Sequence, residues 1–270
     1  MIKASKLCLQ VAQTELLKDL DFQLEPGYFY GLMGPNGAGK STLIRLLAGE
    51  LQASSGSIQY ESKAIQSWSI SKLAQKRAVL PQRSDLSFDY TVEEVVALGR
   101  NPFSREPNEN RLGPQAISEC MESLQLTPLQ ERNYLTLSGG EQQRVHLARI
   151  MAQLWHPETH STPRYLLLDE PATGLDLSHQ HQILEQLRKT ARANTVVLAA
   201  LHEPNHVASY TDRLLVLYGG KLVASGQTDE ILNDKLFEKY FCIQSETLQT
   251  NMQTKNFSFS ASSKNSLDQR

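Results

Sequence analysis

The sequence has little cysteine, no long apolar run and almost no net charge. Its three cysteines, Cys8, Cys120 and Cys242, form no metal-binding spacing and indicate a reducing compartment. No segment reaches the roughly 20 apolar residues that a spanning helix needs, and no secretory signal is visible at the start. With 27 basic and 29 acidic residues, the chain offers no electrostatic case for nucleic acid or anionic lipid as main partner. Any role at a membrane is therefore expected to depend on a partner protein that is embedded in it.

Apolar strand-like runs alternate with helical patterns, which predicts an α/β fold with a mostly parallel sheet. Residues 1–240 are expected to form one domain, into which a helical subdomain of approximately residues 83–150 is inserted. A polar tail, residues 241–270, is expected to be weakly ordered because it is rich in Ser, Asn, Gln and Thr. The candidate strands are Tyr28 to Met33, Tyr165 to Asp169, Thr195 to Leu201 and Arg213 to Leu217, and a hairpin turn is expected at Tyr218 to Lys221.

A glycine-rich loop is the strongest motif of the chain. It matches the Walker A pattern, with four free positions between the outer glycines, and consists of Gly34, Pro35, Asn36, Gly37, Ala38, Gly39, Lys40 and Ser41. A buried strand enters the loop and a helix leaves it, which disfavours a glycine turn without a ligand. Backbone N–H groups and the helix N-terminus of such a loop bind phosphate. We expect Lys40 to contact the β- and γ-phosphates of ATP, Ser41 to bind Mg²⁺, and Thr42 to contact the α-phosphate side.

A second anion site is predicted where Ser138, Gly139 and Gly140 open an amphipathic helix that runs to about Leu154. The alternative is an N-cap that serves only its own helix. This segment, from Leu137 to Arg144, is also the signature motif of ATP-binding-cassette (ABC) ATPases, a family that the chain resembles over about residues 4–240. Five elements match in order, namely the Walker A loop, Gln82, the signature, a Walker B run ending in Glu170, and His202.

The resemblance implies an α/β P-loop nucleotidase core with a mostly parallel sheet, an N-terminal antiparallel β region and an inserted helical subdomain. It also implies that two copies work as a pair. In this family the signature of one subunit caps the γ-phosphate held by the Walker A loop of the other, so Ser138, Gly139 and Gly140 would act in trans. Asp176 falls in the D-loop, which contacts the opposite subunit.

The Walker B run Tyr165-Leu166-Leu167-Leu168-Asp169 predicts a buried strand that brings a carboxylate to the phosphate edge of the sheet. Asp169 would bind Mg²⁺ directly or through water. By resemblance, Glu170 is the general base that orients and polarises the attacking water. The alternative, a purely structural acidic pair, is disfavoured by the D-loop sequence that follows.

Two further polar residues follow candidate strands. His202 ends the run from Thr195 to Leu201, at a position where open α/β sheets present functional groups. In the family this switch histidine contacts the γ-phosphate and helps to fix the water. Gln82, also by resemblance, contacts Mg²⁺ or the water and links the core to the helical subdomain.

Two departures from the family pattern stand out. The region that usually carries an adenine-stacking aromatic reads Leu9 to Thr14 and has none, so adenine is expected to be held either weakly or by apolar side chains such as Val11. The connection from Leu154 to Pro163, which is normally short, is lengthened. This extension resembles the one in the ATPases of bacterial haem importers.

The sequence therefore predicts the ATP-hydrolysing subunit of a bacterial importer of the haem, ferric-siderophore and cobalamin class, with haem preferred. The expected partners are a second copy, two membrane permease subunits and, indirectly, a periplasmic binding protein, and the expected location is the cytoplasmic face of the inner membrane. A membrane-partner helix is expected to dock near Gln82 to Arg105. A soluble ABC protein that acts outside transport, and a nucleotide-binding regulator that does not hydrolyse, are the alternatives.

Overall fold

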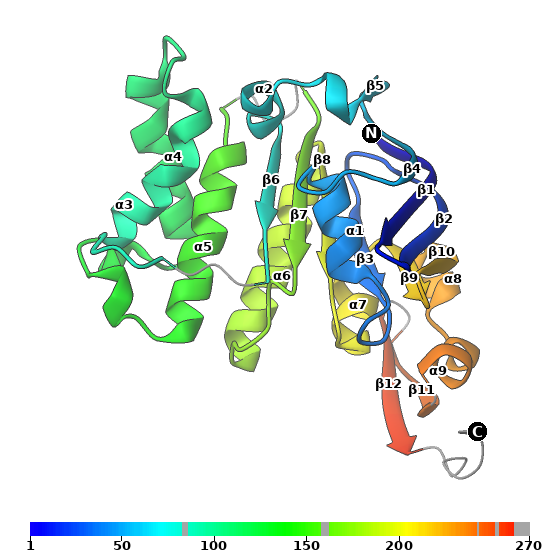
Figure 1. Cartoon of the computed structure of the whole chain (residues 1–270). Helices are drawn as coiled ribbons and strands as arrows, with labels where there is room; N and C mark the ends of the chain where they lie inside the picture. Colours follow the sequence, from blue (N-terminus) through cyan, green and yellow to red (C-terminus); the bar gives the residue numbers. More distant parts are fainter. Residues whose placement is uncertain (83–85, 158–161, 242, 252–253, 262–270) are drawn as a thin grey trace.

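The computed structural model describes residues 1–82, 86–157, 162–241, 243–251 and 254–261. An antiparallel sheet forms the N-terminal part, in the spatial order β2-β1-β4-β5 (Figure 1). Its strands are β1 (Ile2–Val11), β2 (Thr14–Leu24), β4 (Ser55–Tyr60) and β5 (Lys63–Ala64). Inward-facing and outward-facing residues alternate along β2, as expected for a sheet with one face on the core. The predicted N-terminal β region is confirmed.

The central sheet runs in the order β10-β9-β3-β8-β7-β6. Its neighbours pair in parallel except for β9 and β10, which form the predicted hairpin with Tyr218 opposite Lys221. Every residue of β3, β7 and β8 is buried, which explains why the central residues of these strands are apolar on both faces. The strands are β3 (Phe29–Met33), β6 (Arg77–Leu80), β7 (Arg164–Asp169), β8 (Thr195–Ala200), β9 (Arg213–Tyr218) and β10 (Lys221–Gln227).

The two faces of β7 belong to different hydrophobic cores. Tyr165 and Leu167 pack with the antiparallel sheet and α1 (Lys40–Leu47), whereas Leu166 and Leu168 pack with α5 (Gly139–Leu154) and α6 (Leu177–Arg192). This division follows from the period of two along a strand. Helices therefore cover both faces of the central sheet and leave its carboxyl edge for polar residues.

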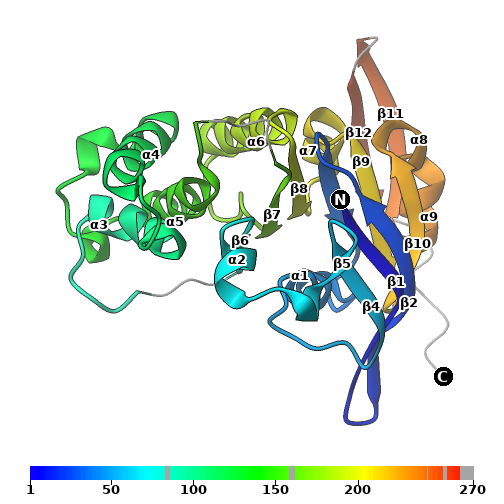
Figure 2. The same cartoon turned by 90° about the horizontal axis from the view of Figure 1, so that it is seen from above.

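The helical subdomain lies beyond β6, on the side away from β3 (Figures 1 and 2). It contains α3 (Val92–Ala97), η2 (Leu98–Phe103), α4 (Glu109–Ser123), η3 (Thr127–Leu129), η4 (Tyr134–Thr136) and α5. A buried ion pair ties it together, because the Arg100 guanidinium lies 2.7 Å from Glu109 and donates to the carbonyl of Ala152 at 2.7 Å. Two short elements precede it, η1 (Ile65–Ser67) and α2 (Ile70–Ala74).

After β10 the chain forms α8 (Thr228–Ile231), α9 (Asp234–Phe241) and an antiparallel hairpin of β11 (Ile243–Asn251) and β12 (Thr254–Ala261). The hairpin occupies the segment that the sequence predicts as a polar tail. Asn205 of α7 (Pro204–Tyr210) binds the backbone of Phe257, donating to its carbonyl at 3.4 Å and accepting from its N–H at 2.8 Å. The polar composition of the tail therefore does not exclude regular pairing, and its weak order stays a prediction. Within the described segments no helix combines the length and apolarity needed to cross a membrane.

Candidate functional site

The Walker A loop joins the carboxyl end of β3 to the start of α1. Gly39 is the N-cap of α1 with φ +103°, a left-handed conformation that favours glycine. Gly34 has φ +154°, and a Cβ there would lie 2.3 Å from the carbonyl oxygen of Leu217. Two of the predicted glycines are therefore required by the backbone itself, and the loop presents the helix N-terminus at the edge of the sheet.

Lys40 lies inside this loop. Its side chain is buried, and Nζ donates to the carbonyls of Gly34 at 2.7 Å and Pro35 at 3.1 Å. Burial lowers the pKa of Lys40, while the carboxylates of Glu170 and Asp169 act in the opposite direction. The cation predicted to contact phosphate is thus held at the loop, next to the two acidic residues of the Walker B strand.

Three strands bring their polar residues together around Glu170. Oε1 of Glu170 lies 2.6 Å from Nε2 of His202, which follows β8, and accepts a hydrogen bond at 3.2 Å from Nε2 of Gln82, which follows β6. Parallel strands place their carboxyl ends at one edge, which is why residues 120 positions apart in sequence meet here. A cavity of about 280 Å³ opens beside Glu170 and His202, bordered by Thr173, Gly174 and Gln180.

Glu170 itself is held in an unusual backbone conformation, with φ +56°. This is rare for a large residue without local constraint and is typical of functional positions. Burial acts to raise the pKa of the Glu170 carboxyl, but hydrogen bonds from His202, Thr173 and Gln82 outweigh it, so the pKa lies below its ordinary value. The side chain is therefore a carboxylate with its orientation fixed from three sides, as a base that positions water needs to be.

The burial and hydrogen bonding of Asp169 indicate whether the site suits a divalent cation. Its side chain is only 5% exposed, and burial raises its pKa despite a hydrogen bond from Ser41. Among the described residues, none donates a hydrogen bond to its Oδ1 atom. A buried carboxylate oxygen without a donor, beside a serine hydroxyl, is a donor set that fits Mg²⁺.

The signature serine caps α5. Ser138 Oγ accepts from the N–H of Glu141 at 3.3 Å, and Glu141 Oε2 accepts from Ser138 N at 2.8 Å, which forms a capping box. The N–H of Ser138 lowers the pKa of Glu141. The local alternative, an N-cap for its own helix, is thus realised in the structure. β6 and β7 lie between α5 and α1, so the signature and the Walker A loop of one chain are on different parts of the molecule (Figure 1).

The D-loop residue Asp176 is the N-cap of α6. Its carboxylate accepts from the His179 N–H at 3.0 Å and lies 2.7 Å from His179 Nδ1, and these contacts lower its pKa. In the region predicted to meet adenine, Val11 ends β1 with 55% of its surface exposed. Both side chains are accessible, but their roles toward a partner or a base stay predictions.

Sequence reasoning missed two contacts of the site. Thr173 donates through Oγ1 to Glu170 Oε2 at 3.2 Å, and Gln143 of α5 donates to the carbonyl of Pro171 at 3.2 Å. Gln143 thereby connects the signature helix to the residue after Glu170. Gln143 lies inside the signature segment and Thr173 lies three residues after Glu170, and this proximity to the motifs is the only signal in the sequence.

Comparison with known proteins agrees with these features. A sequence model of the family described as "ABC transporter" matches residues 17–173. Two curated proteins named "Hemin import ATP-binding protein HmuV" are similar to the chain over 244 residues. The protein from Gloeobacter violaceus is 44% identical over 90% of this chain and 88% of its own length, and the one from Pseudomonas fluorescens is 41% identical over 90% and 93%.

A solved structure described as an inward-facing conformation of a putative metal-chelate type ABC transporter superposes with a TM-score of 0.77. It is 25% identical and covers 97% of this chain and 98% of its own. The fold class predicted from the sequence is confirmed.

Proposed function

The chain belongs to the ABC transporter family and is an ATP hydrolase of that family, and we propose that it drives a bacterial haem importer. The observation that supports this cargo is that relatives from five organisms, 36–44% identical over about 90% of the chain, carry the name hemin import ATP-binding protein. The sequence feature that favours haem over other cargoes is the extended connection between α5 and β7. Residues 158–161 of this connection lie outside the described structure.

In the proposed reaction, Glu170 accepts a hydrogen bond from water and aligns it for attack on the γ-phosphate of ATP. Its lowered pKa keeps it in the basic form at neutral pH. His202 holds Oε1 of Glu170 and contacts the γ-phosphate, and Gln82 contacts the same water. Lys40 and the N–H groups of residues 34–42 bind the phosphates.

Ser41 and Asp169 would hold Mg²⁺, because the buried oxygen of Asp169 needs a cation or a hydrogen-bond donor. Gln82 would contact the same ion. When bound, the ion supplies positive charge that stabilises the phosphate oxygens during transfer. The chain's own contribution is to keep the carboxylate oriented through the Ser41 hydroxyl.

ATPase subunits of this family work in pairs together with membrane permease subunits. We infer that Ser138, Gly139 and Gly140 of one copy cap the ATP bound by the Walker A loop of the other, with Asp176 at the contact. The separation of α5 from α1 within one chain supports an arrangement in trans (Figure 1). Two permease subunits and a periplasmic binding protein would complete the importer, with this chain on the cytoplasmic face of the inner membrane.

The test is reconstitution of the chain with its co-purifying membrane subunits in proteoliposomes, with the binding protein outside. Hemin is expected to accelerate ATP hydrolysis and to enter the vesicles, whereas a complex carrying Glu170→Gln should do neither. Stimulation by cobalamin or a ferric siderophore, with none by hemin, would replace the cargo and keep the importer. A chain that associates with ribosomes or DNA and with no membrane protein would refute the transport function.

A further inference from the structure

The turn that follows Glu170 is held by helices on two sides. Gln143 of α5 donates through Nε2 to the carbonyl of Pro171 at 3.2 Å, and Gln180 of α6 donates through Nε2 to the carbonyl of Ala172 at 3.2 Å. Pro171 and Ala172 are both buried, where a carbonyl without a donor costs free energy. Two consecutive carbonyls of this turn therefore accept hydrogen bonds from side chains of α5 and α6.

These hydrogen bonds matter because the backbone of Glu170 is strained. Its φ of +56° lies in the left-handed region, which a large residue occupies only where its surroundings fix it. The backbone N–H of Thr173 donates to the carbonyl of Glu170 at 3.3 Å, so the turn closes on Glu170 itself. A displacement of the carbonyl of Pro171, one residue further along, would therefore change the orientation of the Glu170 side chain.

The same turn contacts the first turn of the signature helix at a second point. A Cβ placed on Gly140 would lie 3.1 Å from Cδ2 of Leu175, so this leucine covers the α-carbon of Gly140. Leu175 also packs against the hydrophobic core to which α5 and α6 contribute. Gly140 and Gln143 are three residues apart and lie on one face of α5. This face of α5 therefore contacts residues 170–175 at two points.

The two ends of this connection serve different ATP molecules in the proposed dimer. The signature at the start of α5 caps the ATP of the partner copy, whereas Glu170 acts on the ATP of its own chain. We propose that Gln143 is a positioning residue that couples the two sites. When the signature is seated on the partner's ATP, Gln143 holds the turn after Glu170 and thereby orients the base. This inference rests on the proposed pairing in trans.

The kinetics of the chain assembled with its membrane subunits test the coupling. Gln143→Met keeps the length of the side chain but removes its donor, and it is expected to lower kcat by up to about 10²-fold, the effect of a small misplacement of a catalytic group. The Hill coefficient for ATP should exceed 1 in wild type, with a limit of about 2 for two sites, and should fall to about 1 in the variant.

Dimerisation is measured separately by light scattering. In the Glu170→Gln background, Gln143→Met should leave the ATP-dependent dimer intact, because Ser138 and its capping box are unchanged. A loss of kcat with the dimer retained assigns Gln143 to the orientation of the base and not to the assembly of the pair.

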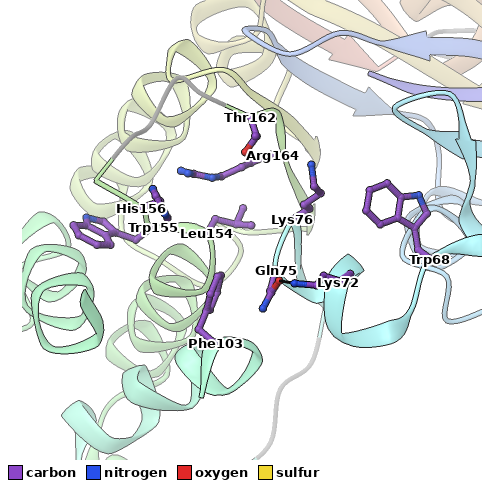
Figure 3. A pocket seen from close by; sticks show the side chains of 10 residues that line it. All are labelled: Trp68, Lys72, Gln75, Lys76, Phe103, Leu154, Trp155, His156, Thr162 and Arg164. Carbon is purple, nitrogen blue, oxygen red and sulfur yellow. Dashed lines mark hydrogen bonds between the residues drawn. The ribbon is translucent and has the colours of Figure 1, made fainter. Parts of the chain in front are cut away.

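Gln153→Met is the matched control on the same helix. Gln153 donates through Nε2 to the carbonyls of Ala74 at 2.7 Å and Arg77 at 3.0 Å, at the end of α5 away from the signature. Figure 3 shows this end, where Leu154 lines a pocket together with Arg164, the first residue of β7. The control removes hydrogen bonds of the same kind, so it should lower the unfolding midpoint at least as much, whereas kcat and the Hill coefficient should stay at their wild-type values.

A mixed complex decides which ATP site Gln143 serves. One copy carries Glu170→Gln, and two different affinity tags isolate complexes that contain one copy of each kind. Gln143→Met in the copy with the intact base should slow single-turnover phosphate release, whereas the same change in the Glu170→Gln copy should not. The opposite pattern would mean that the change damages the signature over the partner's ATP, and it would overturn the proposal.

The outcomes separate the coupling from the pairing on which it rests. If Glu170→Gln dimerises with ATP but wild type has a Hill coefficient of 1, or Gln143→Met has unchanged kinetics, the coupling is refuted and the pairing stands. Absence of the dimer would refute both. If Gln143→Met does not fold, Gln143→Glu takes its place, because its side chain regains a donor only when protonated. Its kcat relative to wild type should rise as the pH falls, and a constant ratio would refute the role of the hydrogen bond.

Discussion

His202 Nε2 lies 2.6 Å from the same Glu170 oxygen that accepts a hydrogen bond from Gln82. Oε1 of Glu170, which follows β7, thus contacts residues that follow the two neighbouring strands, β8 and β6. Gln82 directly precedes the segment that leads into the helical subdomain, so a movement of that subdomain would change a hydrogen bond to the proposed base. We infer that the orientation of Glu170 depends on both β8 and the helical subdomain.

Removal of the base should separate chemistry from binding. Glu170→Gln keeps the size of the side chain and is expected to slow ATP hydrolysis by about 10²–10⁴-fold, the usual contribution of general base catalysis. ATP affinity should be retained. Light scattering is then expected to show a dimer with Mg²⁺-ATP and a monomer without it. A hydrolysis rate close to wild type would exclude Glu170 as the base.

The acid limb of the pH–rate profile should report the lowered pKa of Glu170. Because the pKa of Glu170 is lowered, its contacts stabilise the folded state fully at pH values above the ordinary pKa of glutamate. This stability is lost as the pH falls through the lower pKa of the folded state. Thr173→Val removes one hydrogen bond that lowers this pKa. The limb should move to higher pH by less than about one unit, because the hydroxyl is exposed to solvent.

The control is Thr190→Val, which removes a threonine hydroxyl that donates to the carbonyl of Gln186 within α6. It should leave the limb in place. Circular dichroism at each pH would separate unfolding from titration, and a limb that moves equally in both variants would contradict the assignment to Glu170.

Asp169 should limit stability in the absence of metal. Because burial raises its pKa, the folded state loses stability as the pH rises through the interval between the ordinary and the raised value. Asp169→Asn removes that charge and is expected to raise the unfolding midpoint in Mg²⁺-free buffer at neutral pH, by about 2–4 °C for each kcal/mol gained.

With Mg²⁺-ATP the order should reverse, because a ligand that binds the folded state stabilises wild type more than a variant that binds it weakly. Calorimetry under both conditions measures the two shifts. If Asp169→Asn is less stable than wild type without Mg²⁺, then Lys40 and Ser41 offset the whole free-energy cost of burying the Asp169 charge, which would contradict the prediction.

Ser138 has a local and a proposed intersubunit role, and two substitutions separate them. Ser138→Asp keeps an N-cap for α5 but places a negative charge where the γ-phosphate of the partner is expected, so it should prevent ATP-dependent dimerisation without unfolding the helix. The experiment is done in the Glu170→Gln background by light scattering.

Thr91→Ala is the matched control, because Thr91 caps α3 with the same type of capping box. It should cost about 1 kcal/mol of stability and leave dimerisation intact. A dimer that forms equally well with Ser138→Asp would limit Ser138 to its own helix.

The motifs were predictable because each depends on short, local sequence. The apolar runs of β3, β7 and β8 and the glycines of the Walker A loop place Lys40, Asp169 and Glu170 without knowledge of the fold. Their meeting at one edge also follows from the rule for parallel strands. The hairpin of β11 and β12 was not predicted, because its polar residues resemble a tail and its contact with Asn205 is made by backbone atoms.

The sequence by itself determined the family chemistry, since the spacing of glycines, lysine and carboxylates fixes which groups can bind phosphate and activate water. Only the tertiary structure decided that Glu170 is held from three sides, and that Oδ1 of Asp169 is buried without a donor among the described residues. Those properties depend on which side chains converge from distant segments. Burial and electrostatic interaction act through space, and a linear pattern does not contain them.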